Sequence, residues 1–290
     1  MTQSVGEARQ RRMRAGSTGR WGSSLAELRN SRGLLVNLTL REIRGKYKRT
    51  ALGQLWSLLN PVAQMVTYSV VFSIVLRGNH PKAGNPSGLD VFALWLTCGL
   101  LPWLFFQNVM TSGMGALIAN ANLIQKVYFP RSALVISSGL ALVFTFTIEM
   151  SVLTIALLVF GGSPLLYLPA TLFYMVVLFG LGLGLSFILS IGNVYFRDTQ
   201  HFISIAMQIW FYATPIIYPI SVVSGSHPGA VKYYRLNPIE RFTEIFRNTM
   251  YDGRWPTFAD GAYVVVWAVA ALVIGYGVFI RYEGRLAEEL

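Results

Sequence analysis

Long runs without a formal charge constrain this chain more than any other feature. No Asp, Glu, Lys or Arg occurs within 51–76, 91–125 or 261–280, and Glu149 is the only charge between Arg131 and Arg197. A helix needs roughly 20 predominantly apolar residues to cross a bilayer. The 290 residues are 53% hydrophobic and only 13% charged, whereas soluble domains carry about 25% charged residues. The sequence therefore predicts an all-α integral membrane protein.

The apolar runs divide into six predicted spans. They lie near 58–77, 91–113, 133–160, 165–192, 202–220 and 261–281. An even number of spans places both termini on one side, and Lys and Arg mark the cytoplasmic side. Twelve of the 24 Lys and Arg residues precede Ala51, and five more share that side against seven on the other. We therefore expect the N- and C-termini to be cytoplasmic. The basic face should bind anionic membrane lipids, and we do not expect it to bind nucleic acid.

The residues outside the spans complete the predicted organisation. Residues 1–24 are polar and Arg-rich, which is typical of a flexible cytosolic tail, and 283–290 form a cytosolic C-terminus. Residues 25–56 mix apolar and basic side chains, which favours an amphipathic helix at the membrane interface over a disordered basic linker. The interface residues expected there are Arg41, Arg44, Lys46, Tyr47, Lys48 and Arg49. Residues 57–282 form the predicted six-span transmembrane domain.

The loop after the second predicted span has helical character. In 115–134, Leu117, Ala121, Ile124 and Tyr128 lie at helical spacings, and Pro130 follows. A short helix parallel to the membrane can dock into a groove on a cytosolic partner. The alternative is an ordinary helical turn between spans.

The end of the fifth predicted span carries two prolines, in the stretch FYATPIIYPI (211–220). Each proline removes a helical hydrogen bond, so Pro215 and Pro219 should end the span at the outer interface. Beyond them, Asn237, Pro238 and Glu240 are suited to the N-cap, first and third positions of a helix. A helix over 238–250 is about 20 Å long at ~1.5 Å per residue, too short for a hydrocarbon core of about 30 Å. It should lie in the interface or be re-entrant.

Five ordered segments resemble a known family. They are LREIRGKYKRTALGQLWSLLNP, NLIQKVYFPRSAL, NVYFRDTQH, FYATPIIYP and LNPIERFTEIFRN, all within about 35–282. They are similar to the membrane subunits of ABC-2 type exporters for lipid-linked polysaccharides, the group of O-antigen, teichoic-acid and galactan permeases. The resemblance implies a homodimer in the bacterial inner or plasma membrane that forms one channel and binds two copies of a separate ABC ATPase.

The resemblance also assigns residues to roles. It implies an ATPase-coupling helix at about 118–129 and an outer gate at about 215–252. The coupling residues would be Asn122, Leu123, Ile124, Lys126, Val127 and Phe129. The gate would include Pro215, Pro219, Asn237, Glu240, Glu244 and Arg247. No GxxxxGK[ST] phosphate loop occurs in the sequence, so we expect no cofactor in this chain, with ATP and Mg²⁺ on the partner ATPase.

A wide sugar channel favours aromatic walls. The candidates are Trp103, Phe105, Phe106, Trp210, Phe211, Tyr212 and Tyr218, and the alternative for each is a place in the lipid-facing aromatic belt. Glu149 lies within a span, where a carboxylate is either functional or hydrogen-bonded to a neighbouring helix. Gly180 and Gly184 are spaced for close helix packing.

The expected function is ATP-driven export of a lipid-linked polysaccharide by a chain that is not itself an enzyme. Two alternatives stay open: an ABC-2 exporter of a small lipophile or lipo-oligosaccharide, and a membrane-embedded enzyme acting on lipid-linked sugars. No convergent catalytic residues and no metal ligands are evident in the sequence. Arginine outnumbers lysine 19 to 5, typical of a GC-rich genome, and this favours a cell-wall galactan over an O-antigen.

Overall fold

The computed structural model describes residues 27, 31–46, 55–70, 84–127, 129–226 and 228–286. Within these residues the secondary structure is helical and no strand occurs, which confirms the all-α prediction. The longer helices are α3 (Arg32–Lys46), α4 (Trp56–Val70), α5 (Phe92–Ala119), α7 (Ser132–Val159), α8 (Leu168–Tyr195), α9 (Thr199–Tyr212) and α13 (Phe258–Glu283). The shorter elements are α6 (Ala121–Lys126), η3 (Pro164–Tyr167), α10 (Ile220–Ser226), η4 (Pro228–Ala230), α11 (Val231–Tyr234), α12 (Pro238–Phe246) and η5 (Arg247–Asp252).

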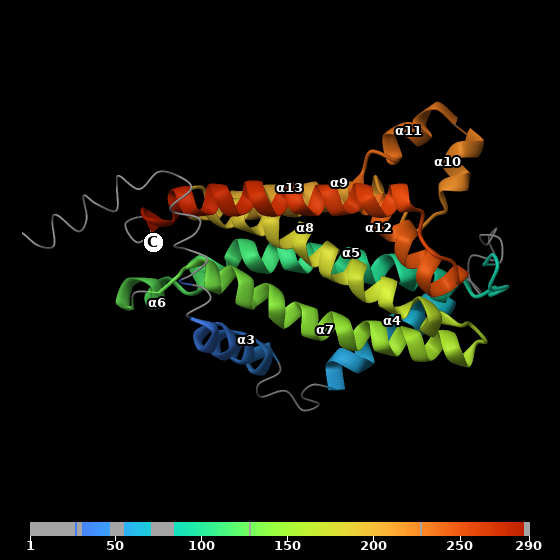
Figure 1. Cartoon of the computed structure of the whole chain (residues 1–290), viewed down its shortest axis with the longest axis horizontal. Helices are drawn as coiled ribbons and strands as arrows, with labels where there is room; N and C mark the ends of the chain where they lie inside the picture. The colour runs from blue at the N-terminus through green and yellow to red at the C-terminus, as the bar shows by residue number, and fades with distance from the viewer. Residues whose placement is uncertain are drawn as a thin grey trace, which may run out of the picture.

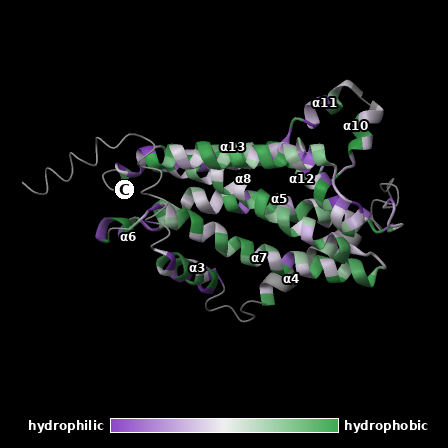
Figure 2. Cartoon of the chain, in the orientation of Figure 1, coloured by the Kyte–Doolittle hydropathy of each residue, from purple (hydrophilic) through white to green (hydrophobic). Residues whose placement is uncertain are grey.

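Four helical segments are long and apolar enough to cross a membrane. They are Phe92–Ala119, Ser132–Val159, Pro164–Tyr195 and Phe258–Glu283. Their helices α5, α7, α8 and α13 run along the long axis of the molecule (Figure 1), and apolar residues follow them over most of their length (Figure 2). The short helices α10, α11 and α12 gather at one end of this bundle, and α6 and the C-terminal end of α13 lie at the other.

The other two predicted spans do not reach this length within the described residues. Helix α4 has 15 residues and α9 has 14. At ~1.5 Å per residue both are well short of a hydrocarbon core of about 30 Å. The first predicted span, 58–77, extends beyond α4 into residues outside the described part of the chain.

The fifth predicted span ends earlier than we expected. The sequence predicts a span over 202–220, but α9 stops at Tyr212, and turns and bends follow over 213–218. The reason is local: Pro215 has no N–H to bond the carbonyl of Phe211 and disfavours a helical conformation at the residue before it. The N–H of Thr214 bonds that carbonyl instead, at 3.2 Å, and closes the helix with a tighter turn.

Glycines allow α8 and α13 to pack closely against each other. A Cβ at Gly184 of α8 would collide with the backbone of Ala271 on α13, and a Cβ at Gly275 would collide with the backbone of Gly184. A Cβ at Gly180 would lie 3.1 Å from Leu272 Cδ1. The prediction that Gly180 and Gly184 allow two helices to approach closely is therefore confirmed.

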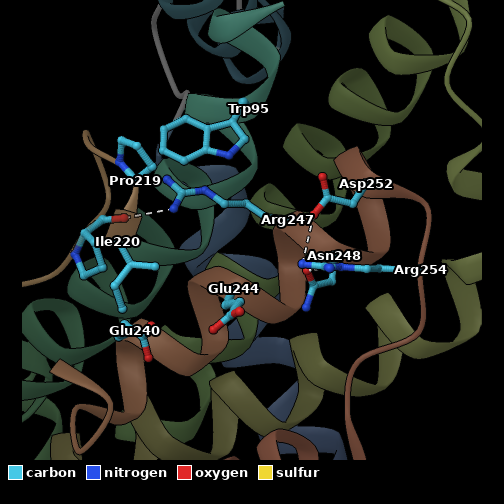
Figure 3. A pocket seen from close by; sticks show the side chains of 10 residues that line it. Trp95, Pro219, Ile220, Glu240, Glu244, Arg247, Asn248, Asp252 and Arg254 are labelled. Atoms are coloured by element: carbon cyan, nitrogen blue, oxygen red, sulfur yellow. Dashed lines mark hydrogen bonds and ion pairs between the residues drawn. The ribbon is translucent and has the colours of Figure 1, made fainter. Parts of the chain in front are cut away.

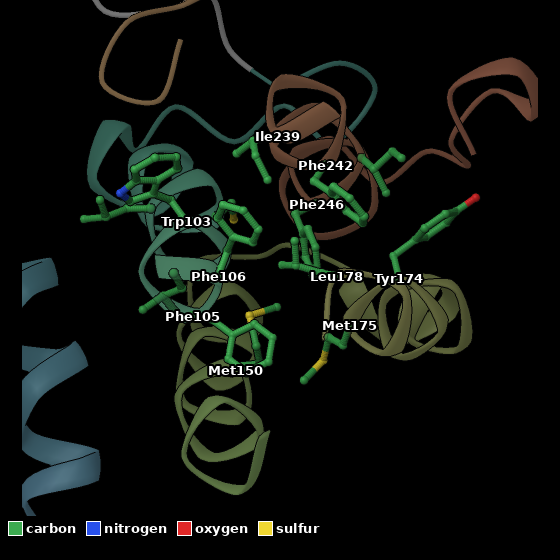
Figure 4. Packing of buried hydrophobic residues seen from close by; sticks show 14 of the residues in the cluster. Trp103, Phe105, Phe106, Met150, Tyr174, Met175, Leu178, Ile239, Phe242 and Phe246 are labelled. Atoms are coloured by element: carbon green, nitrogen blue, oxygen red, sulfur yellow. The ribbon is translucent and has the colours of Figure 1, made fainter. Parts of the chain in front are cut away.

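Two apolar clusters form the core. The larger one joins α5, α7, α8 and α12, and Figure 4 shows Phe105 and Phe106 of α5 beside Phe246 of α12 in it. Its aromatic part also includes Phe105 stacked on Phe146 with ring centroids 4.2 Å apart. The smaller one gathers Leu38 of α3, Ile124 of α6 and the ends of α5, α8 and α13. The first cluster supports the end with α12, and the second supports the end with α6.

Helix α3 is the described part of the predicted 25–56 interface helix. It packs against α7 and carries Arg41, Arg44 and Lys46. Tyr47, Lys48 and Arg49, and the predicted tail 1–24, lie outside the described residues.

Candidate functional site

Asn237 joins the end of α9 to the start of α12. Its Oδ1 accepts from the backbone N–H of Ile239 at 3.0 Å, so the predicted N-cap is confirmed. The same oxygen accepts from Trp210 Nε1 at 3.1 Å, and Asn237 Nδ2 donates to Thr214 Oγ1 at 2.8 Å. The local cap thus also fixes α12 against the turn that follows α9. The predicted helix over 238–250 is present as α12 continued by the wider turn η5.

The Arg247 side chain is buried at the centre of this end of the bundle. Its Nη1 donates to the carbonyl of Pro215 at 2.9 Å, and its Nη2 donates to the carbonyl of Ile216 at 2.5 Å. The guanidinium also lies over the Trp95 ring of α5, 3.5 Å from the centroid (Figure 3). Pro219 deprives the Pro215 carbonyl of its helical partner, and the Arg247 guanidinium replaces that partner.

Gly99 makes room for this guanidinium. A Cβ at Gly99 would lie 2.7 Å from Arg247 Nη2 and 2.8 Å from Thr243 Cγ2. Any other residue at this position of α5 would therefore displace Arg247 or the helix that carries it. Three separate parts of the chain, α5, the turn after α9 and α12–η5, meet at this one side chain.

Carboxylates surround Arg247 on the same helical face. Glu240, Glu244 and Arg247 are spaced i, i+4 and i+7, and Asp252 follows in η5. Burial lowers the pKa of Arg247 to about 9, against the opposite effect of neighbours that include Glu244 and Asp252, so the guanidinium remains charged at neutral pH. Burial raises the pKa of Glu240 to about 7, with the nearby Glu244 charge acting in the same direction.

These side chains line a cavity of about 150 Å³. Figure 3 shows them converging from α12–η5, from Trp95 and from the segment after α9. The lining residues are Trp95, Pro215, Pro219, Ile220, Glu240, Glu244, Arg247, Asn248, Asp252 and Arg254. Five of them, Pro215, Pro219, Glu240, Glu244 and Arg247, are gate residues predicted from the sequence.

Apart from Asn237, the remaining predicted gate residues are aromatic, and those of α5 are buried within the chain while Trp210 and Phe211 are partly buried. Trp103 and Phe106 are 1% and 0% exposed and pack edge-on against Trp210, while Phe211 contacts Trp103. Phe105 belongs to the core beside Phe146. These rings join α5 to α9 rather than form an open wall in this chain.

Two predicted gate tyrosines lie nearer the surface. Tyr212 is exposed, and Tyr218 is partly buried, with its hydroxyl donating to the Tyr212 carbonyl at 2.9 Å.

The predicted coupling loop folds as the short helix α6, with a cavity of about 180 Å³ beside it. Ile124 is buried in the smaller apolar cluster, so its side chain supports the helix from behind and is not available to a partner in this structure. Asn122, Lys126 and Val127 are exposed, and Leu123 and Phe129 are partly buried.

Helix α3 contacts this coupling loop. Arg41 Nη2 donates to Asn120 Oδ1 at 2.6 Å, at the junction of α5 and α6. Leu38 lies in the same apolar cluster as Ile124. The N-terminal helix therefore helps to position α6.

Glu149 lies near the basic end of α3. Lys46 Nζ donates to Thr145 Oγ1 at 3.3 Å, and Glu149 is one helical turn further along α7, where the Lys46 charge attracts it. The sequence left two interpretations open for Glu149, a functional carboxylate and one that interacts with a neighbouring helix. The nearby Lys46 of α3 agrees with the second interpretation.

Sequence reasoning missed several residues of the Arg247 site. Trp95, Gly99 and Asp252 are far from Arg247 in sequence or lack a motif, and no pattern singles them out. Asp252 accepts from the backbone N–H of Asn85 at 3.4 Å, and Tyr251 donates to the Leu89 carbonyl at 2.7 Å. The i, i+4, i+7 spacing of charges on α12 was the one available signal for a polar face.

Among the residues that the structure describes, no group of three or more His, Cys, Asp or Glu side chains is placed to hold a metal ion.

The fold defines the class of this protein: an integral membrane protein built from a bundle of apolar helices, with a charged site in short helices at one end. Comparison with known proteins identifies the family. The family described as ABC-2 type transporter matches residues 34–251 of the 290, so the chain belongs to the ABC-2 type transporter family.

Similar proteins match over nearly the whole chain. The O-antigen export system permease protein RfbA of Myxococcus xanthus is 31% identical over 90% of this chain and 96% of its own length. An RfbA permease of Klebsiella pneumoniae is 28% identical over 89% of this chain and 95% of its own length. The polysialic acid transport protein KpsM of Escherichia coli is 23% identical over 85% of this chain and 92% of its own length.

Proposed function

We propose that this chain is the channel-forming subunit of an ATP-driven exporter of a lipid-linked polysaccharide, such as an O-antigen, a teichoic acid or a cell-wall galactan. The observation that carries the proposal is the 31% identity to an O-antigen export permease across 96% of that protein's length. More distant relatives are named for polysialic acid and capsule polysaccharide, so polymeric sugars are common to the matched proteins.

The energy for export comes from a separate ATPase in this proposal. The sequence has no phosphate-binding loop of the P-loop type. Asn122, Gln125 and Lys126 of α6 and Val127 directly after it are exposed and give a partner a surface at the end of the bundle that carries the basic α3. Two copies of this chain and two ATPase subunits complete the proposed transporter.

The proposed orientation places α6 and both termini in the cytoplasm and α12 at the outer surface. The excess of Lys and Arg before Ala51 supports it. A cysteine at Ser31, in a variant lacking Cys98, should resist an impermeant thiol reagent in intact cells and react after permeabilisation. Labelling in intact cells would show that the chain has the opposite orientation in the membrane.

Deletion of the gene tests the function. Loss of surface polysaccharide, accumulation of the lipid-linked polymer inside the cell and restoration by the intact gene are expected. Normal surface polymer, with loss of only a short lipo-oligosaccharide or a small lipophile, would favour the alternative exporter. An enzyme acting on lipid-linked sugars would instead change the structure of the polymer and leave its location unchanged.

A further inference from the structure

One side of α5 is polar and open, whereas the rest of the helix is packed. Of the 28 residues of α5, only Asn108, Ser112 and Ala119 are exposed. Gln107 and Thr111 lie beside the first two at helical spacing and are partly buried. We call Gln107, Asn108, Thr111 and Ser112 the polar face of α5. Its side chains are two amides and two hydroxyls.

The polar face lies at the depth of the hydrocarbon core. Helix α5 is one of the segments long and apolar enough to cross a membrane. Asn108 lies 16 residues from Phe92 and 11 from Ala119, about 24 and 16 Å from the two ends at ~1.5 Å per residue. Polar side chains at this depth face a bundle interior or a water-filled cavity, because lipid tails cannot hydrogen-bond them. Asn108 is outside the packed interior of this chain, so water is the medium that suits it.

The amides of this face differ from the hydroxyls that α7 exposes. Thr147 and Ser151 of α7 are exposed, but their hydroxyls donate to carbonyls of their own helix at 2.9 and 2.7 Å. Within the described part of the chain, the side-chain amides of Gln107 and Asn108 make no hydrogen bond. Moving an unpaired amide from water into lipid is unfavourable. The two amides therefore need water or another hydrogen-bonding molecule beside them.

Helix α13 shows how a lipid-facing surface differs in the same chain. Between positions 266 and 274 its exposed residues are all apolar: Val266, Trp267, Val269, Val273 and Ile274. Both helices are long enough to span the membrane, and both expose residues near the middle of their length. The exposed side of α13 matches lipid, and that of α5 does not.

The polar face suits an uncharged partner that is rich in hydroxyl groups. No Asp, Glu, Lys or Arg occurs within 91–125, so the face has no fixed charge of its own to hold an ion. A side-chain amide offers both donors and an acceptor, and a hydroxyl also donates and accepts. Water and sugar hydroxyls can therefore replace one another along this face. Such exchange keeps binding weak enough for a molecule to move on.

We propose that the polar face of α5 is a wall of the water-filled path through the membrane, where its amides and hydroxyls contact the hydroxyl groups of the exported polymer. The inference rests on the proposed function and deepens it, because it names a surface that the polymer touches at mid-membrane. The predicted channel aromatics Trp103 and Phe106 pack against Trp210, so they support this wall from behind.

Cysteine accessibility tests the placement of the path. Asn108→Cys and Ser112→Cys would be made in a full-length Cys98→Ala variant. The matched controls are Val269→Cys and Val273→Cys, near the middle of α13. Membranes from cells that express each variant would be opened by freeze–thaw, so that a charged methanethiosulfonate reagent reaches both sides. The thiolate is the reactive form of cysteine, and it forms in water but not in lipid.

The two α5 cysteines should react at least about tenfold faster than the two α13 cysteines, because lipid excludes both the thiolate and the charged reagent. Equal rates in the two helices would overturn the proposal. Rapid oxidation of Asn108→Cys to a disulfide between two copies, without reaction with the reagent, would also overturn it, since the face would then be a packed interface.

Contact with the polymer is tested by export. The double variant Gln107→Leu and Asn108→Leu removes both amides and should lower the amount of surface polysaccharide, while the chain is still present in the membrane at its usual level. Val269→Leu should export normally. Normal export by the double variant would overturn the contact between this face and the polymer.

The labelling assay does not depend on export. Equal labelling of α5 and α13, together with loss of surface polysaccharide in the deletion strain, removes the path along α5 and leaves the proposed function standing. Normal surface polysaccharide in the deletion strain removes the proposed function and, with it, the polymer as the occupant of this path.

Discussion

Gly99 offers a sharp test of how Arg247 is held. A Cβ at this position would lie 2.7 Å from Arg247 Nη2 and 2.8 Å from Thr243 Cγ2. Neither neighbour can move freely. The guanidinium is fixed by two backbone carbonyls and the Trp95 ring, and Thr243 is fully buried on α12. Gly99→Ala must therefore strain the packing or break one of the Arg247 hydrogen bonds.

Both routes have similar free-energy costs. Overpacking a well-packed core costs about 1–3 kcal/mol, and losing a hydrogen bond from a charged group costs about 1.5–3 kcal/mol. Alanine in place of glycine within a helix offsets up to about 1 kcal/mol of this. The net expectation for Gly99→Ala is a loss of about 1–2 kcal/mol in the free energy of unfolding.

The matched control is Gly115→Ala on the same helix. Beyond the adjacent backbone of its own helix, a Cβ at Gly115 meets no atom of the described residues within 4 Å, so this variant should keep only the helical gain of up to about 1 kcal/mol. Thermal unfolding of the purified chains in one detergent should place Gly99→Ala below the unsubstituted chain and Gly115→Ala at or above it. If the two variants unfold at the same temperature, the guanidinium is not held as described.

Three further predictions concern the turn, the coupling helix and the buried carboxylate. The double variant Pro215→Ala and Pro219→Ala restores two helical N–H donors, so α9 should extend and the complex should assemble and hydrolyse ATP but export poorly; export at the normal rate would contradict this. Val127→Asp, on the exposed face of the coupling loop, should reduce co-purification of the ATPase without lowering the unfolding temperature of the chain. Ile124→Asp should lower both the co-purification and the unfolding temperature, because it buries a charge. Full recovery of the ATPase with Val127→Asp would show that this face is not part of the interface. Since burial raises the pKa of Glu240 from 4.5 to about 7, its folded state favours the protonated form, and stability should fall as pH rises from about 4.5 through about 7. Glu240→Gln should make the unfolding temperature nearly independent of pH between about 4.5 and about 7. If the unfolding temperature of this variant still falls over that range, another group causes the pH dependence.

Local chemistry made parts of this site predictable. Asn237 and Pro238 are a capping residue and a first-turn proline next to each other, and the helix they predict begins where expected. Gly180 and Gly184 were likewise readable from their spacing, because close packing needs only the absence of side chains.

Long-range contacts explain what the sequence did not reveal. The prolines predict a break after α9, but the partner of the Pro215 carbonyl is a guanidinium 32 residues further along the chain. Trp95 and Gly99 belong to an apolar helix and acquire their roles only when α12 packs against it.

The buried face of α6 was also not predictable from its own residues. Helical spacing places Ile124 and Val127 in the same short segment but does not say which one faces the core. The structure buries Ile124 because α3 supplies Leu38 to the same cluster, while Val127 remains exposed. The direction of a short amphipathic helix is set by its neighbours.

Transport by the purified components tests the central claim most directly. The full chain would be reconstituted in proteoliposomes with its proposed ABC ATPase partner, and lipid-linked polysaccharide extracted from the deletion strain would be added to the membrane. Protection of the polymer from an external glycosidase should depend on ATP in vesicles where the ATPase faces outward, and should vanish without the ATPase. Polymer that stays fully accessible during steady ATP hydrolysis, while a small lipophile is moved, would contradict the proposal that this chain forms the path of a polysaccharide.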